Sequence, residues 1–291
     1  MPKADLENLS LHYVQMGRGP DVMLIHGLAS DLAFWYLGVM RLLSRHFRVT
    51  AFDMRGHGYS DTPPTGYNSA DLAGDLCQLL DFLEIERAHL VGHSFGGSVA
   101  LHFAAIHPKR VLSLTLADAR VNALQERLPP RGDERWRKVR EAVERLGVQL
   151  PGEIPAVAYA VLEELLGSFS EAPSENLIRA GLTGFFGIRN GSSRKLTRWV
   201  RLMENTTAKT DFNAVADLTR ERLQALDHSA LAIYGENSCC METCEGLLQE
   251  LQCCSSIILP QTGHLHPFLQ PKIFVEHVEP WIAHHDEPPG S

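Results

Sequence analysis

The residues best suited to chemistry lie in the segment 92–96, Gly-His-Ser-Phe-Gly, which has the pattern G-x-S-x-G. An apolar run at 88–92 predicts a strand just before it, and the stretch 95–107 predicts a helix just after it. A serine on such a turn projects its hydroxyl above the sheet edge, and the helix N-terminus stabilises developing negative charge. The pattern therefore predicts that Ser94 is a nucleophile. The alternative is that Ser94 only caps the helix, although a simple cap would not require the flanking glycines.

Three further motifs follow predicted strands. They are His26-Gly27, the loop segment 53–61 (Asp-Met-Arg-Gly-His-Gly-Tyr-Ser-Asp) and Gly263-His264. Through these motifs, taken in order with the serine segment, the chain resembles proteins of the α/β-hydrolase fold over nearly its whole length outside the block 122–227. The resemblance implies a mostly parallel central sheet, helices on both faces and an inserted helical cap. Haloalkane dehalogenases and epoxide hydrolases of that superfamily carry Asp in place of Ser94, so the resemblance favours acyl transfer instead.

A serine nucleophile needs a general base. In the family that this chain resembles, a histidine in the loop after the last strand has this role, and His264 stands there. An imidazole with a pKa near ~6.5 can accept the serine proton and return it to the leaving group. His266 is the competing candidate. We interpret His93 as a packing residue, because a neighbour of Ser94 in sequence directs its side chain elsewhere.

The sequence departs from the family pattern at the position of the acid that would orient His264. The resemblance implies G-x-x-D directly after the predicted strand 231–234, but the segment 235–238 reads Gly-Glu-Asn-Ser. Ser238 therefore stands where an Asp is usual, and no Asp follows in that loop. A Ser–His pair with an oxyanion hole retains some catalysis without a proper acid.

Three explanations remain open. Some members of the superfamily place the acid after the preceding core strand, where this chain has Asp118. Glu236 or Glu242 could reach His264 with a longer side chain. The acid could also be absent, which would make the protein a weak enzyme or a ligand-binding protein.

The resemblance also implies the other parts of the site. The oxyanion hole would use the backbone N–H groups of Leu28, which follows His26-Gly27, and of Phe95. Pockets for small molecules are mostly apolar, so Trp35, Phe185 and Phe186 are predicted to contact a hydrophobic part of the substrate.

Strands and helices alternate over both ends of the chain. The predicted strands are 9–15, an edge strand, then 21–25, 47–53, 88–92, 111–117, 231–234 and 256–259. The predicted helices are 72–83, capped at Asn68 or Ser69, then 95–107, 242–251 and 271–284. Strands that alternate with helices imply right-handed crossovers and a mostly parallel sheet that is covered on both faces.

The alternation stops in the block 122–227, where the pattern is mostly helical. A helical block between two strands of such a sheet predicts a cap over the carboxyl edge, where ligands bind. We therefore expect a first core part at 1–121, a cap at 122–227 and a second core part at 228–291.

Five of the six cysteines lie within 239–254. Zinc sites usually show paired C-x₂₋₄-C spacing, which Cys240 and Cys244 fit only loosely and the adjacent Cys-Cys pairs do not. Cys240 and Cys244 are also one helical turn apart, so these thiols can pack as small apolar groups. We expect reduced thiols, no bound metal and no cofactor.

The composition is that of an ordinary globular protein. The 291 residues are 44% hydrophobic and 21% charged, with a net charge of −8, which excludes collagen-like, low-complexity and disulfide-scaffold classes. The acidic balance argues against nucleic acid as a partner, and no apolar run reaches the ~18 residues of a membrane helix. The N-terminus does not resemble a signal peptide. We expect a cytoplasmic protein with a small-molecule substrate and no membrane partner. The sequence leaves open whether it forms a homodimer.

Together these patterns predict a serine hydrolase that cleaves an ester, lactone or thioester of a small, partly apolar substrate. The acyl-enzyme would form on Ser94, with His264 as general base. Two alternatives remain: hydrolysis of a C–C bond in a vinylogous diketone, and a binding protein of the same fold with little or no turnover.

Overall fold

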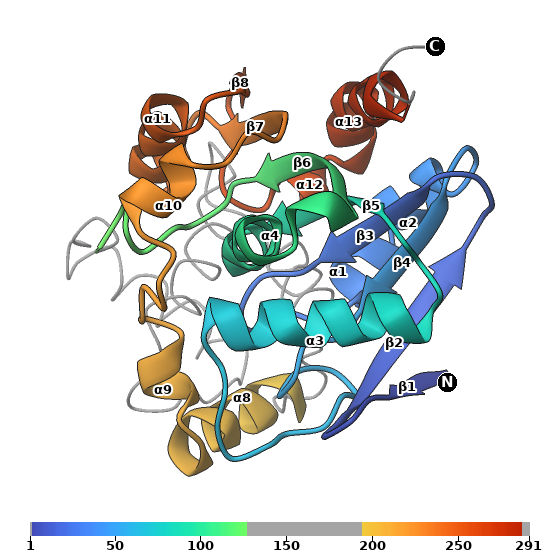
Figure 1. The fold of residues 1–291 in the computed structure, drawn as a ribbon, viewed down its shortest axis with the longest axis vertical. Helices are drawn as coiled ribbons and strands as arrows, with labels where there is room; N and C mark the ends of the chain where they lie inside the picture. The colour runs from blue at the N-terminus through green and yellow to red at the C-terminus, as the bar shows by residue number, and fades with distance from the viewer. Residues whose placement is uncertain (1, 127–193, 287–291) are drawn as a thin grey trace, which may run out of the picture.

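The computed structural model describes residues 2–126 and 194–286, and their strands form one sheet (Figure 1). The strands are β1 Lys3–Asp5, β2 Ser10–Met16, β3 Asp21–Ile25, β4 Arg48–Phe52, β5 Ala88–His93, β6 Val111–Ala117, β7 Ala230–Gly235 and β8 Cys254–Leu259. Their order across the sheet is β1-β2-β4-β3-β5-β6-β7-β8. β1 and β2 run antiparallel to their neighbours, and the other strands pair in parallel. This confirms the predicted mostly parallel sheet.

Helices occupy the connections between the strands. They are α1 Ala33–Tyr36, α2 Val39–Leu43, α3 Ser69–Phe82, α4 Phe95–Ile106, α8 Arg194–Asn205, α9 Ala208–Asp211, α10 Arg220–Gln224, α11 Met241–Glu250, α12 His266–Leu269 and α13 Pro271–His285. Asn68 caps α3 because its side chain accepts the backbone N–H groups of Ala70 and Asp71, which decides between the two predicted caps.

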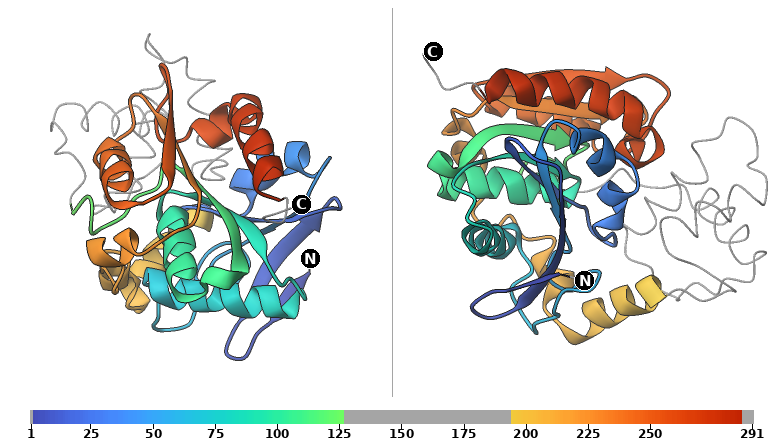
Figure 2. Two further views of the ribbon diagram at one scale, coloured as in Figure 1. Left: turned by 45° about the horizontal axis from the view of Figure 1, so that its top comes forward. Right: turned by 90° about the vertical axis from the view of Figure 1, so that its right-hand side faces the viewer.

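Helices cover both faces of the sheet, as Figure 2 shows from two sides. Successive residues of a strand point to opposite faces, so Val22 and Leu24 of β3 join one apolar cluster while Met23 and Ile25 join another. The first cluster lies under α2 and α13, and the second under α3, α4 and α11. Burial on both sides explains why the central strands read as continuous apolar runs.

The sheet edge differs from the prediction. The strand expected at 9–15 forms as β2, but it is the second strand, because β1 pairs with it antiparallel and lies outside it. β1 has only three residues, Lys-Ala-Asp, and of these only Ala4 is buried. So short a strand has no alternation long enough to be recognised in the sequence.

The chain changes direction across the sheet between β3 and β5. β4 pairs on one side of β3, and β5 pairs on the other. In sheets of this type the crevice at the carboxyl ends of the two central strands is the usual ligand site. His26-Gly27 directly follows β3 and Ser94 directly follows β5, so two of the sequence motifs meet at this point.

Of the block 122–227, the structure describes residues 122–126 and 194–227. α8, α9 and α10 fall within it, and its described residues contain no strand. Phe185 and Phe186 lie outside the described residues. None of the described helices is long and apolar enough to cross a membrane.

Candidate active site

Ser94 occupies a sharp turn between β5 and α4. Its backbone has φ 53° and ψ −122°, a conformation that L-residues rarely adopt and that costs about 1–3 kcal/mol. Although Ser94 stands at the N-cap position of α4, its side chain makes no capping hydrogen bond. This observation disfavours the alternative that the serine is only a helix cap.

The glycines on either side of Ser94 allow the turn to form. A Cβ on Gly92 would lie 2.3 Å from the carbonyl oxygen of Gly96, and a Cβ on Gly96 would lie 2.3 Å from that of Ile25. Both neighbours are backbone atoms, which cannot move aside cheaply. The elbow therefore needs glycine at both positions, as the sequence pattern indicated.

Asp118 follows β6 directly and is fully buried. Its carboxylate accepts the backbone N–H of Gly235 at 2.9 Å and the hydroxyl of Ser238. His264 and His266 also reach this carboxylate. Burial alone would raise the pKa of Asp118, but the hydrogen bonds from the two histidines outweigh it and hold the pKa below its ordinary value. Asp118 is therefore an ionised acid on the inside of the site.

The two candidate histidines contact different oxygens of Asp118. His264 Nδ1 lies 3.4 Å from Oδ1, and His266 Nε2 lies 3.0 Å from Oδ2. His266 Nε2 also lies 3.2 Å from the carbonyl oxygen of Ile233, so it donates into the sheet. A catalytic base of this kind is oriented through Nδ1, and it is Nδ1 of His264 that contacts the carboxylate. The geometry favours His264 over His266.

The two glutamates proposed as alternative acids are exposed. The carboxylate of Glu236 accepts the backbone N–H of Gln261 at 2.9 Å, and neither Glu236 nor Glu242 bonds to His264 among the described residues. The structure thus brings Asp118, and neither glutamate, to the histidine. Ser238, which stands where an Asp is usual, donates its hydroxyl to Asp118 instead.

The predicted oxyanion donors lie near the elbow. A Cβ on Gly27, which precedes Leu28, would be 2.9 Å from the Cβ of Ser94, so the two loops are in contact. Within the described part of the chain, the backbone N–H groups of Leu28 and Phe95 have no hydrogen-bond acceptor. Two such donors beside a serine can bind the oxygen of a tetrahedral intermediate.

Two buried histidines, His93 and His26, hold the backbone of loops around the site through their ring nitrogens. His93 donates from Nε2 to the carbonyl oxygen of His264 at 2.9 Å, and its ring stacks on Phe34 at 4.4 Å. Burial, with the nearby His264, lowers the pKa of His93 well below its ordinary value. A neutral His93 therefore holds the backbone of His264, a role that adjacency in sequence to Ser94 did not reveal. His26 accepts the backbone N–H of Met54 at 3.1 Å and fixes the loop after β4.

The aromatic residues after the His26-Gly27 loop occupy the core more than the site. Trp35 is fully buried and packs against Phe34 at 4.8 Å and Phe274 at 6.0 Å. This placement favours packing over the predicted contact with substrate. Phe34 is closer to the site, because its ring lies 4.4 Å from that of His93, whereas the Trp35 ring lies 6.3 Å from it.

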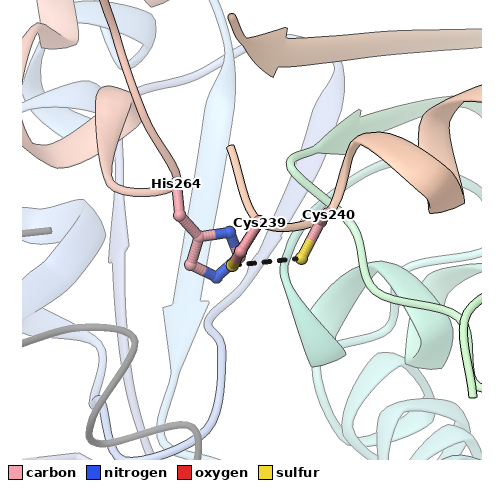
Figure 3. A group of neighbouring side chains, drawn as sticks. All are labelled: Cys239, Cys240 and His264. Carbon is pink, nitrogen blue, oxygen red and sulfur yellow. Dashed lines mark hydrogen bonds between the residues drawn. The ribbon is translucent and has the colours of Figure 1, made fainter. Parts of the chain in front are cut away.

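Cys239 and Cys240 follow β7 and so lie at this edge of the sheet. None of the six cysteines forms a disulfide. Cys240 and Cys244 are buried in the apolar cluster around α11. Cys239 and Cys240, however, also lie beside His264 (Figure 3).

Comparisons with known proteins agree with this architecture. A model of the α/β hydrolase fold family matches residues 20–177, more than half of the chain. The chain spans about a third of the length of curated relatives that it matches; epoxide hydrolase 3 from Siraitia grosvenorii is 37% identical over 108 residues, 36% of this chain and 34% of that protein.

Solved structures match over nearly the full length. A meta-cleavage product hydrolase from Pseudomonas fluorescens has a TM-score of 0.71 at 22% identity, covering 98% of both chains. A thermophilic esterase from Thermogutta terrifontis has a TM-score of 0.70 at 23% identity, covering 98% of this chain and 99% of that one. These likenesses show the fold, and the family match identifies it. The chain belongs to the α/β hydrolase fold family.

Proposed function

We propose that this protein is a serine hydrolase that cleaves an ester, lactone or thioester of a small, partly apolar substrate. The observation that carries the proposal is the contact between His264 Nδ1 and the buried Asp118, at the same sheet edge as the strained Ser94 elbow. A serine after β5, a buried carboxylate after β6 and a histidine after β8 are the parts that nucleophilic acyl transfer needs.

In the proposed reaction, Ser94 Oγ forms a bond to the substrate carbonyl carbon while its proton passes to His264 Nε2. The negative oxygen of the tetrahedral intermediate accepts the N–H groups of Leu28 and Phe95. The intermediate collapses, the bond to the leaving group breaks, and His264 protonates that group. Water then attacks the acyl-enzyme with the same histidine as base and releases the acid. Asp118 orients His264 and stabilises its imidazolium.

The elbow residue also separates this chain from some of its relatives. Its matched relatives include proteins named epoxide hydrolases, while esterases and a meta-cleavage product hydrolase are among the structures of similar fold. Epoxide hydrolases of the superfamily use Asp at the elbow, whereas this chain has Ser94. A serine supports acyl transfer, and this is why an ester, lactone or thioester is proposed.

A fluorophosphonate probe tests the assignment of Ser94. The wild-type protein should be labelled and should hydrolyse members of a panel of p-nitrophenyl esters and lactones, and Ser94→Ala should do neither. Ser98→Ala is the matched control, because Ser98 lies one turn further along α4 and donates its hydroxyl to the carbonyl oxygen of Arg120. This variant should keep both labelling and turnover.

Three other outcomes would reject the proposal. Equal labelling of Ser94→Ala would exclude Ser94 as the nucleophile. Turnover of a vinylogous diketone without turnover of any ester would favour C–C hydrolysis. Tight binding of a small apolar ligand without turnover of any substrate would favour the binding protein.

A further inference from the structure

Two cysteines and the candidate base form one cluster at the carboxyl edge of the sheet. Cys239, Cys240 and His264 each offer a ligand atom, and these atoms all lie within 4.8 Å of one another (Figure 3). The cysteines come from the turn between β7 and α11, and the histidine comes from the loop after β8. The described residues contain no other group of three such side chains. The cluster joins residues that are distant in sequence, so the cysteine spacing alone did not predict it.

We propose that Cys239, Cys240 and His264 bind a thiophilic divalent cation such as Zn²⁺. Two thiolates and one imidazole, with water as the fourth ligand, are a recognised tetrahedral zinc set. With Zn–S bonds of about 2.3 Å, two sulfurs of a tetrahedral site lie about 3.8 Å apart. The two sulfurs here are 3.9 Å apart before any cation binds. Small rotations of the side chains then bring the imidazole to bonding distance.

The charges around the cluster suit a divalent cation. Binding replaces the two thiol protons, which pass to solvent, and leaves two thiolates on the cation. The Asp118 carboxylate lies beside His264, and the half-buried Arg120 guanidinium interacts electrostatically with both thiols. The cation, the two thiolates, the carboxylate and the guanidinium together are neutral. A buried site with balanced charge avoids the desolvation cost of an unpaired ion.

The second shell of the histidine also suits a cation. Ligand histidines commonly donate their other ring nitrogen to a carboxylate. A cation on His264 Nε2 leaves Nδ1 directed to Asp118, where it lies already. Nε2 is also the nitrogen that accepts the serine proton in the proposed reaction. The cation would therefore inhibit hydrolysis reversibly, an inference that rests on the proposed function, whereas the binding itself does not.

Equilibrium dialysis against Zn²⁺, followed by metal analysis, tests the binding directly. The reduced wild-type protein should retain one equivalent, and Cys239→Ser and His264→Asn should each bind at least about tenfold more weakly. Cys253→Ser is the matched control, since Cys253 is an exposed thiol outside the cluster, and it should bind as the wild type does. Cys239 is half-buried, so its replacement disturbs the core less than replacement of the buried Cys240.

Cobalt provides a readout of the ligands. Bound Co²⁺ should give the visible bands of a tetrahedral site and a thiolate charge-transfer band, both lost in Cys239→Ser. Unchanged affinity in Cys239→Ser and His264→Asn, or a cobalt spectrum without thiolate character, would overturn the site.

A hydrolysis assay separates this inference from the proposed function. The hydrolysis rates of the wild type and of Cys239→Ser are each measured with and without Zn²⁺. A chelator should restore the rate that the wild type has without Zn²⁺. The inhibition ratio of Cys239→Ser should be close to one. If no substrate is ever turned over, the dialysis result still decides the cation site. If hydrolysis is found but zinc neither binds nor inhibits, only the cation site is rejected.

Discussion

At the scale of single residues, the Asp118 carboxylate is the group that several residues of the candidate site contact. It is held by the backbone of Gly235, by Ser238 and by two histidines, and none of its surface is exposed. A buried carboxylate with so many donors stays ionised and fixed in place. Such a group can hold the tautomer of a histidine and balance the positive charge that this histidine gains during catalysis.

Replacing the acid should therefore be costly. We expect Asp118→Asn to lower kcat at least ~100-fold, because an amide cannot stabilise the imidazolium and favours the wrong tautomer. Glu236→Gln is the matched control at an exposed carboxylate on the neighbouring loop and should stay within about twofold of the wild type. The measurement is kcat on the best ester found. A larger loss in Glu236→Gln than in Asp118→Asn would move the acid to Glu236.

Ser238 offers a second test of the same carboxylate. Its hydroxyl bonds to Asp118, so a carboxylate at position 238 would lie close to the same histidine. Ser238→Asp alone should lower kcat, because two buried carboxylates repel each other and one becomes protonated. In the Asp118→Asn background, Ser238→Asp should restore kcat at least ~10-fold. A double variant no more active than Asp118→Asn would show that position 238 cannot supply the acid.

The sequence predicted some of these residues and left others open for a physical reason. Ser94 and His264 belong to local motifs, in which the neighbouring residues define a turn or a loop. Asp118 could not be chosen over Glu236 or Glu242, since its role depends on contacts between strands that are distant in sequence. The carbonyl contact that His93 makes with His264 depends on the same tertiary packing.

At the scale of elements, the elbow depends on how closely α4 packs against β3 and β5. Gly96 lies in the first turn of α4, and a Cβ there would meet the carbonyl oxygens of Ile25 at 2.3 Å and His26 at 2.6 Å. The helix N-terminus is thereby held against the loop that carries Leu28. The same close approach positions Ser94 and both proposed oxyanion donors. The packing of α4 and the proposed chemistry therefore both require a glycine at position 96.

A pair of glycine substitutions tests this requirement. Gly96→Ala should lower the free energy of unfolding by at least about 2 kcal/mol, because the methyl group displaces backbone atoms. Gly74→Ala, in α3 with nothing within 4 Å of its Cβ, should raise it by about 0.5–1 kcal/mol. Urea unfolding of both variants measures the difference. A Gly96→Ala protein as stable as the wild type would show that the elbow has room to adjust.

Strands and helices were predicted best where the hydrophobic pattern extended over many residues. The central strands and the helices α3, α4, α11 and α13 form close to their predicted positions because burial imposes a clear periodicity on them. β1 was missed because three residues carry no period. Trp35 was predicted to contact substrate from its place in the chain, but the direction of its side chain depends on how α1 packs on α13.

At the scale of the whole molecule, the buried histidines link stability to pH. His57, in the loop after β4, is buried against His26, Trp199 of α8 and Phe212. Its Nδ1 donates to the carbonyl oxygen of Arg55 at 3.0 Å, which fixes the orientation of the ring. Burial, with the nearby His26, lowers the pKa of His57 to about 3. Protonation of this ring would place a positive charge in the buried contact between the loop after β4 and α8.

The unfolded chain takes up a proton at His57 below its ordinary pKa of 6.5, whereas the folded chain does so only near about 3. Stability is therefore complete above pH ~6.5 and falls as the pH is lowered towards 3. Between pH 8 and 5 this single histidine should remove about 2 kcal/mol from the free energy of unfolding. His57→Gln should show a loss smaller by that amount in urea unfolding at the two pH values. His46→Gln, at an exposed histidine, should lose as much as the wild type. If His57→Gln also lost as much, the acid sensitivity would arise at other buried groups.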